Sequence, residues 1–300
     1  MNKSIEIPLI GIGPGSVRHG RSYRPIKGNN LFSKAVNKVT DKLFYHKLAK
    51  NYLSSMTHAL QLGYRLIDYS AAYGSGELIG KAIRKSGVPR KDLFITTRVS
   101  NGAQREHRVR EQIVSCIHNM GLDYVDLLQF HWPVTDLYLD TWREMEKLKD
   151  EGLVKHLGVA NCHQHHLEEI FKICKYRPEV GQFEIHPLFT QKPLIEYYRE
   201  QDIIVEAYTP IARYDDRLVR LPLLKRLEKK YNKTFVQIIL RWHVQNGVIP
   251  LVRSLSPKHQ QENFGIFDFE LDAEDMEAID GININSRLRY DPDNCDFSIL

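Results

Sequence analysis

The sequence lacks the features that mark membrane, secreted and nucleic-acid-binding proteins. No stretch approaches the roughly 18 apolar residues of a membrane span. The amino-terminal MNKSIEIPLIGIG has no long apolar core followed by a small-residue cleavage site. The charge excess is small, with 42 basic against 37 acidic residues and a formal net charge of +5, which argues against nucleic-acid and membrane-surface partners. We therefore expect a soluble, cytoplasmic protein.

Paired cysteines and metal-binding motifs are also missing. The four cysteines show no CxxC pair and no framework spacing, so we expect reduced thiols at Cys116, Cys162, Cys174 and Cys295. The run HQHH, from His163 to His166, opens a predicted helix but has no fourth ligand at a recognisable spacing. The sequence therefore predicts no functional metal. GIGPG near Gly11 has no following helix or acidic partner and predicts a turn, not a dinucleotide fingerprint.

What the sequence does contain is a regular alternation of short apolar runs with helical periods. One helical face joins Val109 to Met120 and is closed by Gly121, and another begins after Thr234 and is closed by Gly247. The apolar runs predict strands at Tyr64–Asp68, Leu93–Thr97, Val125–Phe130, Lys155–Ala160, Val180–Ile185, Ile203–Tyr208, Val248–Val252 and Gly265–Phe269.

Eight strands alternating with helices, with no boundary rich in Pro, Gly or Ser, favour an α/β fold of the (β/α)8 TIM-barrel type over two domains. The stretch SIEIPLIGIG alternates like a strand, and we expect an N-terminal β-hairpin that closes the barrel bottom. The interpretation is a single barrel domain over residues 1–300.

Polar residues stand where the predicted strands end, and in a barrel those ends form one rim, where catalytic groups are normally found. They are Asp68, Arg98, His131, Asn161, Gln182, Glu184, Tyr208 and Arg253. Tyr73 follows Asp68 by five residues in a Gly-rich turn. An aspartate, a tyrosine, a cation and a histidine at one rim indicate acid–base chemistry built around a phenol.

An ordered set of motifs resembles the aldo-keto reductase family from about Ile7 to the carboxyl terminus. The motifs are GYRLIDYSAAYGSGELIG, VDLLQFHWP, GVANC, VGQFEIHP, EAYTPIA and RWHVQNGVIPLVRSLSPKHQQENFGIFDFEL. The resemblance implies a (β/α)8 barrel that passes a hydride between NADPH and a carbonyl. It also implies that Tyr73 is the general acid, His131 orients the carbonyl and Asp68 is the carboxylate of a catalytic tetrad.

The fourth tetrad position departs from the family, which carries a lysine where this chain has Arg98 in LFITTRVS. A guanidinium does not release its proton, and its planar fork pairs readily with carboxylates. We expect Arg98 to bind the Asp68 carboxylate through two guanidinium nitrogens. We also expect it to stabilise the phenolate of Tyr73 less effectively than lysine would.

The resemblance also implies a cofactor site. Asn161 and Gln182 would hold the nicotinamide carboxamide, and Tyr208 would stack on the nicotinamide beside Thr209 and Ile211. The 2′-phosphate and adenine positions correspond to Arg253, Ser254, His259, Glu262 and Asn263. His259 replaces a customary arginine, so NADP(H) is the first choice of cofactor and NAD(H) the second. Ser256-Pro257 predicts a capped helix start, where backbone amides can face an anion.

An insertion distinguishes this chain from the shorter family pattern. We expect an inserted basic loop and helical segment at about residues 14–60. The loop carries Arg18, Arg21, Arg24 and Lys27 without an acidic residue. It is interpreted either as a lid that selects anionic or sugar-like carbonyl substrates, or as a plain solvated loop. The tail after Asn283 is short, which predicts an open barrel mouth.

Three functions are compatible with these residues. The first is an NADPH-dependent reductase of aldehydes or ketones. The second is a cofactor-binding regulatory or scaffold protein of the same fold, with weak catalysis because Arg98 replaces the lysine. The third, a lyase or hydrolase on a similar barrel, requires a metal or a carboxylate pair that the sequence does not reveal. Neither the physiological carbonyl nor the oligomeric state is indicated.

Overall fold

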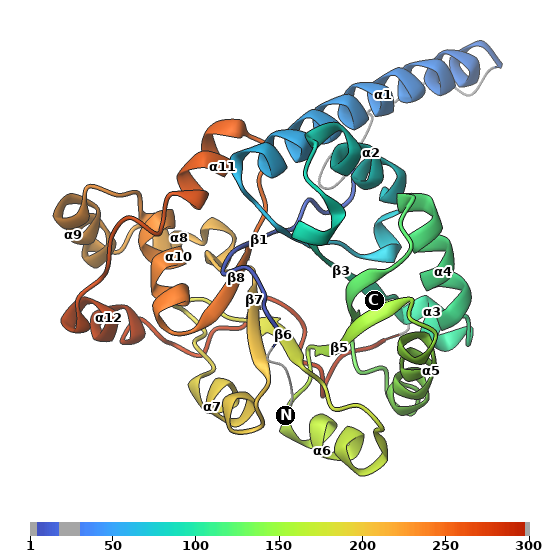
Figure 1. The fold of residues 1–300 in the computed structure, drawn as a ribbon. Helices are drawn as coiled ribbons and strands as arrows, with labels where there is room; N and C mark the ends of the chain where they lie inside the picture. Colours follow the sequence, from blue (N-terminus) through green and yellow to red (C-terminus); the bar gives the residue numbers. More distant parts are fainter. Residues whose placement is uncertain (1–4, 18–30, 298–300) are drawn as a thin grey trace.

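Eight parallel strands close into a barrel in sequence order (Figure 1), which confirms the predicted (β/α)8 fold. The structure is a computed structural model that describes residues 5–17 and 31–297, so the basic loop with Arg18, Arg21, Arg24 and Lys27 lies outside the described residues. The strands are β1 Gly11–Ile12, β2 Leu66–Asp68, β3 Phe94–Val99, β4 Val125–Phe130, β5 Val154–Ala160, β6 Val180–Glu184, β7 Ile204–Tyr208 and β8 Val248–Val252.

Helices surround this barrel (Figure 1). The α-helices are α1 Leu31–Leu62, α2 Gly76–Ser86, α3 Asn101–Arg105, α4 Val109–Met120, α5 Tyr138–Asp150, α6 Gln164–Ile173, α7 Lys192–Glu200, α8 Asp216–Val219, α9 Pro222–Tyr231, α10 Phe235–Gln245, α11 Pro257–Phe264 and α12 Ala273–Asp280. Short 3₁₀ helices are η1 Ala71–Tyr73, η2 Arg90–Asp92 and η3 Ala212–Tyr214.

The predicted helix boundaries follow from capping chemistry. The Thr234 hydroxyl accepts a hydrogen bond from the Gln237 amide at 3.3 Å, and the Gln237 side chain accepts one from the Thr234 amide at 3.1 Å. This reciprocal capping box starts α10. Gly121 ends α4 in the left-handed conformation, at φ 67°, which a residue without Cβ adopts at little cost.

The prediction of the eighth strand, at Gly265–Phe269, was wrong. Gly265–Phe269 follows α11 outside the barrel, where side chains of α10 bond its backbone carbonyls. Gln237 donates to the Gly265 oxygen at 3.1 Å and Arg241 donates to the Ile266 oxygen at 3.3 Å. The remaining strand is β1 instead, which pairs in parallel with both β2 and β8 and so closes the barrel.

Within residues 5–17, the amino-terminal segment covers the barrel bottom without forming a hairpin. Among residues 5–17, the only strand is β1, and it pairs in parallel with its neighbours. Ile5 and Ile7 pack against an apolar cluster inside the barrel. That cluster consists of Leu66, Phe94, Leu127, Val180, Ile249 and Leu251. Because Leu66, Phe94 and Val180 begin their strands, this apolar plug lies at the amino-terminal end, opposite the rim.

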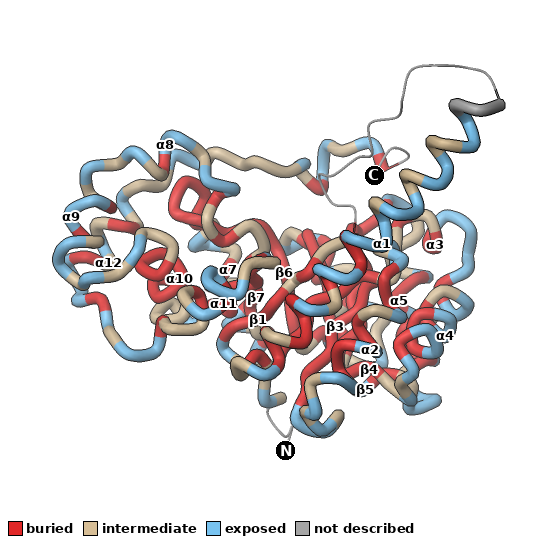
Figure 2. The backbone as a smooth tube through the Cα atoms, turned by 90° about the horizontal axis from the view of Figure 1, so that it is seen from above, coloured by how far each residue is buried: buried red, intermediate tan, exposed pale blue. Residues whose placement is uncertain are grey.

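Helix α1 is much longer than the other described helices. It runs for 32 residues, about 48 Å at 1.5 Å per residue. Its second half packs on the barrel through Tyr52 and Met56, both fully buried. Its first half projects away from the barrel, with Val39 and Leu43 exposed (Figures 1 and 2). No helix in the described ranges is long and apolar enough to cross a membrane.

Candidate active site

Five polar residues from different strands bring their side chains together inside the barrel, and none of these residues is more than 8% exposed. They are Asp68 on β2, Arg98 on β3, Gln129 on β4, Gln182 on β6 and Glu206 on β7. The strand register pairs Arg98 with Gln129 and Gln182 with Glu206. Inward-facing residues at one level of a barrel form a layer. This buried polar cluster is therefore one layer of the barrel interior.

Arg98 is the centre of the cluster. Its Nη2 donates to Asp68 Oδ1 and, at 2.7 Å, to Gln182 Oε1, while its Nε donates to Gln129 Oε1 at 3.3 Å. Burial alone would lower the pKa of Arg98, but the Asp68 carboxylate raises it above its ordinary value. Arg98 therefore keeps its charge and pairs with Asp68 through one nitrogen, not through the two-pronged contact that the sequence suggested.

Glu206 and Gln129 are the two members of the cluster that the sequence analysis missed, and Glu206 is the ionisable one. It is fully buried, and its Oε2 accepts hydrogen bonds from the amides of Gln182 at 2.9 Å and Gln129 at 3.5 Å. These bonds turn both amide oxygens toward Arg98. Burial and the negative charge of Asp68 raise the pKa of Glu206 to about 7. A charged residue between Val205 and Ala207 in an apolar strand was the signal available in the sequence.

Tyr73 ends η1, in the turn between β2 and α2. Its ring contacts Tyr69 edge-on, with ring centroids 5.8 Å apart, and Tyr69 accepts a hydrogen bond from the Ser75 amide at 2.9 Å. Tyr73 is half-buried and interacts electrostatically with Arg98. The structure thus brings the tyrosine, the aspartate and the cation to one region of the rim, as the sequence predicted.

His131 follows β4 and joins the same region. Its backbone amide donates to the Val99 oxygen at 2.9 Å, which ties the end of β4 to β3. Burial, together with the charges of Arg98 and Arg289, lowers the pKa of His131 to about 3. The imidazole is therefore neutral at physiological pH, and a neutral imidazole can donate one hydrogen bond to a ligand oxygen.

The carboxyl-terminal tail reaches the rim, contrary to the expectation of an open mouth. Glu184, at the end of β6, accepts hydrogen bonds from the backbone amides of Leu288 at 2.7 Å and Arg289 at 2.9 Å. The Arg105 guanidinium of α3 donates to the Phe297 oxygen, and the Phe297 ring packs against Trp132. The tail therefore places the positive charge of Arg289 near His131.

Asn161 and Tyr208 are hydrogen-bonded to each other at the rim. The Tyr208 hydroxyl donates to Asn161 Oδ1 at 2.6 Å, and Asn161 Nδ2 donates to the His131 oxygen at 2.9 Å. Asn161 has a φ of 59°, which asparagine tolerates better than most residues. Gln182 points into the buried cluster instead. Of the three residues expected at the nicotinamide, the structure brings Asn161 and Tyr208 together and directs Gln182 elsewhere.

The residues expected to bind the cofactor phosphate lie where β8 leads into α11. The Ser256 hydroxyl caps α11 by accepting from the His259 amide at 3.5 Å, and Pro257 occupies the first turn, as predicted. Arg253 is exposed beside this helix start, and its Nε donates to the Pro14 oxygen at 3.4 Å. A helix amino terminus flanked by an arginine is chemically suited to an anion.

The remaining predicted cofactor residues surround this helix and the loop after β7. His259 is exposed, Glu262 is half-buried and lies 3.7 Å from Lys258, and Asn263 and Ser254 are buried. Thr209 and Ile211 lie in the loop after β7, where Thr209 has a φ of 55°. In α1, the Ser55 backbone oxygen accepts a hydrogen bond from the Gln260 side-chain amide at 3.1 Å, so α1 supports α11.

Comparison with known proteins identifies the family. The family model described as the Aldo/keto reductase family matches residues 47–284. The glyoxal reductase of Bacillus subtilis is 40% identical over 293 residues, which cover 98% of this chain and 95% of that protein. The protein therefore belongs to the aldo/keto reductase family, as the resemblance of its motifs indicated.

Solved structures agree with this assignment. An aldo-keto reductase from a Medee basin deep-sea metagenome library has a TM-score of 0.84 and 32% identity, and the match covers 98% of both chains. An aldo-keto reductase of the silkworm Bombyx mori in complex with NADP has a TM-score of 0.80 and 27% identity, with 97% of this chain and 94% of that chain covered. The protein is an oxidoreductase that acts on carbonyl or alcohol groups, with NADP(H) as the cofactor of its family.

Proposed function

We propose that the protein is an NADPH-dependent reductase of small aldehydes or ketones in which Tyr73 is the general acid. The observation that carries this proposal is the grouping of Tyr73, the neutral His131 and the Asp68–Arg98 ion pair at one rim of the barrel. The similarity to glyoxal reductase points to small dicarbonyl compounds as the first substrates to test.

The roles follow from the chemistry of each group. His131, neutral because its pKa is lowered to about 3, donates a hydrogen bond that orients the carbonyl oxygen. Tyr73 delivers a proton to that oxygen as negative charge develops there. Arg98, held by Asp68, stabilises the phenolate that remains. The reduced nicotinamide, when bound, supplies the hydride to the carbonyl carbon.

The donor set fits this cofactor at its phosphate end. The exposed Arg253, the start of α11 and the exposed His259 offer cationic or amide donors to a phosphate. At the nicotinamide end, Asn161 and Tyr208 lie side by side, and their mutual hydrogen bond must yield for Asn161 to hold a carboxamide. We propose NADPH as the preferred cofactor and NADH as the weaker one.

We also propose that residues 1–300 form one barrel domain with an insertion at about 14–60. The family match begins at residue 47, whereas α1 begins at Leu31 and the first half of that helix projects from the barrel. The basic loop at about residues 14–30 is proposed either to select anionic or sugar-like carbonyls as a lid, or to be a plain solvated loop.

Tyr73→Phe tests the catalytic assignment. General acid catalysis typically contributes about 10²–10⁴-fold, so we expect a fall in NADPH oxidation of at least about 100-fold with glyoxal, methylglyoxal and simple aldehydes. NADPH binding, followed by tryptophan fluorescence, should be retained. Tyr197→Phe, on the outer helix α7, is the matched control and should keep full turnover.

The alternative function predicts a different pattern. The full engagement of Arg98 by three acceptors favours a cofactor-binding protein with weak catalysis as the second candidate. Tight NADPH binding without turnover of any carbonyl in the wild-type protein would support that candidate. Equal turnover by wild type and Tyr73→Phe would remove Tyr73 from the mechanism.

A further inference from the structure

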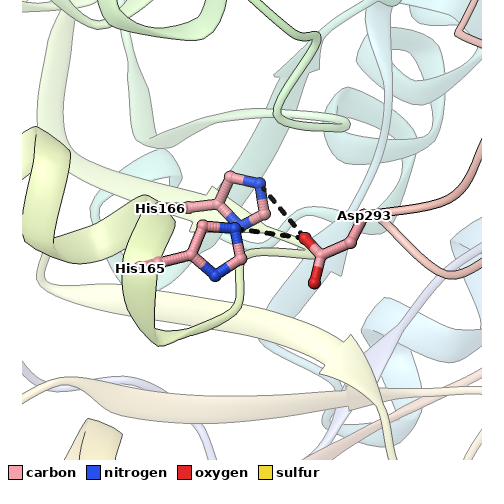
Figure 3. A group of neighbouring side chains, drawn as sticks. All are labelled: His165, His166 and Asp293. Carbon is pink, nitrogen blue, oxygen red and sulfur yellow. Dashed lines mark ion pairs between the residues drawn. The ribbon is translucent and has the colours of Figure 1, made fainter.

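Three histidines at the start of α6 meet one carboxylate from the carboxyl-terminal tail. The His165 Nε2 lies 3.2 Å from Asp293 Oδ1, and the His166 Nε2 lies 3.7 Å from the same oxygen (Figure 3). On the other side, His163 Nδ1 lies 2.7 Å from Asp293 Oδ2. Asp293 is the fourth side chain that spacing within HQHH did not reveal, because it lies 130 residues from His163, in the carboxyl-terminal tail.

The separation of these atoms suits a small divalent ion. Zinc binds imidazole nitrogen and carboxylate oxygen at about 2.0–2.2 Å, so two ligand atoms of a tetrahedral site lie about 3.3–3.5 Å apart. The two nitrogen–oxygen distances, 3.2 and 3.7 Å, bracket that spacing. The ligand atoms of His165, His166 and Asp293 all lie within 4.8 Å of one another, so small side-chain rotations bring them to one ion.

His163 holds the Asp293 carboxylate in place. The Arg287 Nη2 donates to His163 Nε2 at 3.3 Å, so the ring hydrogen of the neutral imidazole lies on Nδ1 and points to Asp293 Oδ2. A hydrogen bond of this kind fixes the orientation of a metal-binding carboxylate. It holds Asp293 with Oδ1 directed toward His165 and His166.

Metal binding has one identifiable cost in this arrangement. His166 Nδ1 accepts the backbone N–H of His163 at 3.1 Å, which places the ring hydrogen on Nε2. An ion at Nε2 displaces this hydrogen, the neutral ring then carries its hydrogen on Nδ1, and the hydrogen bond from the His163 amide is lost. Binding therefore removes this one capping hydrogen bond of α6 while it joins the tail to that helix.

We propose that His165, His166 and Asp293 bind one divalent transition-metal ion of the Zn²⁺ class, with water completing its coordination. Two imidazole nitrogens and a carboxylate oxygen are ligands that such ions prefer. The ion clamps the tail to α6, and the same tail carries Arg289 to the rim near His131. The site therefore couples metal binding to the order of the tail beside the active site.

The test uses the full-length protein after treatment with a chelator. We expect Co²⁺ to bind with one-to-one stoichiometry and to give the visible absorption of a four-coordinate ion, which Zn²⁺ then displaces. His165→Ala and Asp293→Asn should each weaken binding at least tenfold. His118→Ala removes an exposed histidine from α4 and should leave the affinity unchanged. Because His165 is itself exposed, its variant should fold normally.

A second readout separates this clamp from adventitious binding to surface histidines. Hydrogen exchange in residues 286–297 should slow when Zn²⁺ is added to the wild type and stay unchanged in His165→Ala. An affinity equal in His165→Ala and wild type, or lost in His118→Ala, overturns the proposal. So does loss of binding in Asp291→Asn alone, because Asp291 lies with His163 on the other side of Asp293.

Discussion

Replacing Glu206 with glutamine should make the protein more stable at alkaline pH. Glu206 is fully buried on β7, and its Oε2 accepts from the Gln182 and Gln129 amides. Glutamine has nearly the same shape, and its oxygen can accept the same two hydrogen bonds, but it does not ionise. The glutamine NH2 takes the place of Oε1, for which the described residues offer no hydrogen-bond partner, and this cost is the same at every pH. The pH-dependent part of the stability difference therefore isolates the effect of the Glu206 charge.

The magnitude follows from the pKa of this carboxyl. Burial and the charge of Asp68 raise it from 4.5 to about 7, and each unit corresponds to about 1.4 kcal/mol, so the ionised form is disfavoured by about 3 kcal/mol. Because the pKa is raised on folding, the contribution of Glu206 to stability is fully present below about pH 4.5. It falls as pH rises through about 7 and is lost above that pH.

The assay is urea or thermal unfolding of both proteins between pH 5 and pH 9. The advantage of Glu206→Gln should grow with pH and level off above about pH 7.5. At about 2 cal/mol/K of unfolding entropy per residue, about 3 kcal/mol in a 300-residue chain is a Tm difference of about 5 °C. Glu196→Gln makes the same chemical change on the exposed face of α7 and should alter stability by less than about 0.5 kcal/mol. A Glu206→Gln difference that is independent of pH would refute the reasoning.

Two further substitutions test the rim. A lysine at position 98 cannot reproduce the hydrogen bond from Arg98 Nε to Gln129. We therefore expect Arg98→Lys to lower the free energy of unfolding by about 1–3 kcal/mol while carbonyl reduction persists. A sharp loss of turnover at normal stability would show that catalysis requires arginine. Arg253→Ala removes a charged hydrogen-bond donor beside α11. We expect NADPH to bind tenfold or more weakly, a loss of about 1.5–3 kcal/mol of binding free energy. NADH binding should be much less affected. Equal losses for the two cofactors would contradict a role for Arg253 at the 2′-phosphate.

The sequence was sufficient for the barrel but not for its closure. Seven strands have apolar runs long enough to be recognised, and capping residues such as Thr234 and Gly121 mark helix ends locally. The eighth, Gly11–Ile12, is two residues long and has no measurable periodicity. Its identity as a strand depends on pairing with both β2 and β8, which is a property of the folded chain. Gly265–Phe269 has the apolar composition of a strand without that pairing.

For the candidate site, too, the sequence predicted some features and not others. Asp68, Arg98 and His131 were predicted at one rim because a parallel barrel brings strand ends together, and this argument needs only positions in the sequence. The role of Tyr73 came from the resemblance of its motif to the family. It does not reveal hydrogen-bond partners, so the commitment of Gln182 to the buried cluster was not foreseen. The approach of Asp293 to the histidines of α6 depends on the path of a tail without secondary structure. Such a path has no signature in periodicity or spacing.

The charges and acceptors of the buried cluster suit an arginine at position 98, where the resemblance to the family implies a lysine. Asp68 and Glu206 are two carboxylates in a space from which water is largely excluded, and Arg98 is the cation hydrogen-bonded to Asp68 there. Two ionised carboxylates beside one guanidinium would leave a net negative charge in a low dielectric, so Glu206 keeps its proton up to about pH 7. A guanidinium offers donors in several directions at once and can engage Asp68, Gln182 and Gln129 together. Arginine and Glu206 therefore form one unit, and substituting either should change what the other contributes.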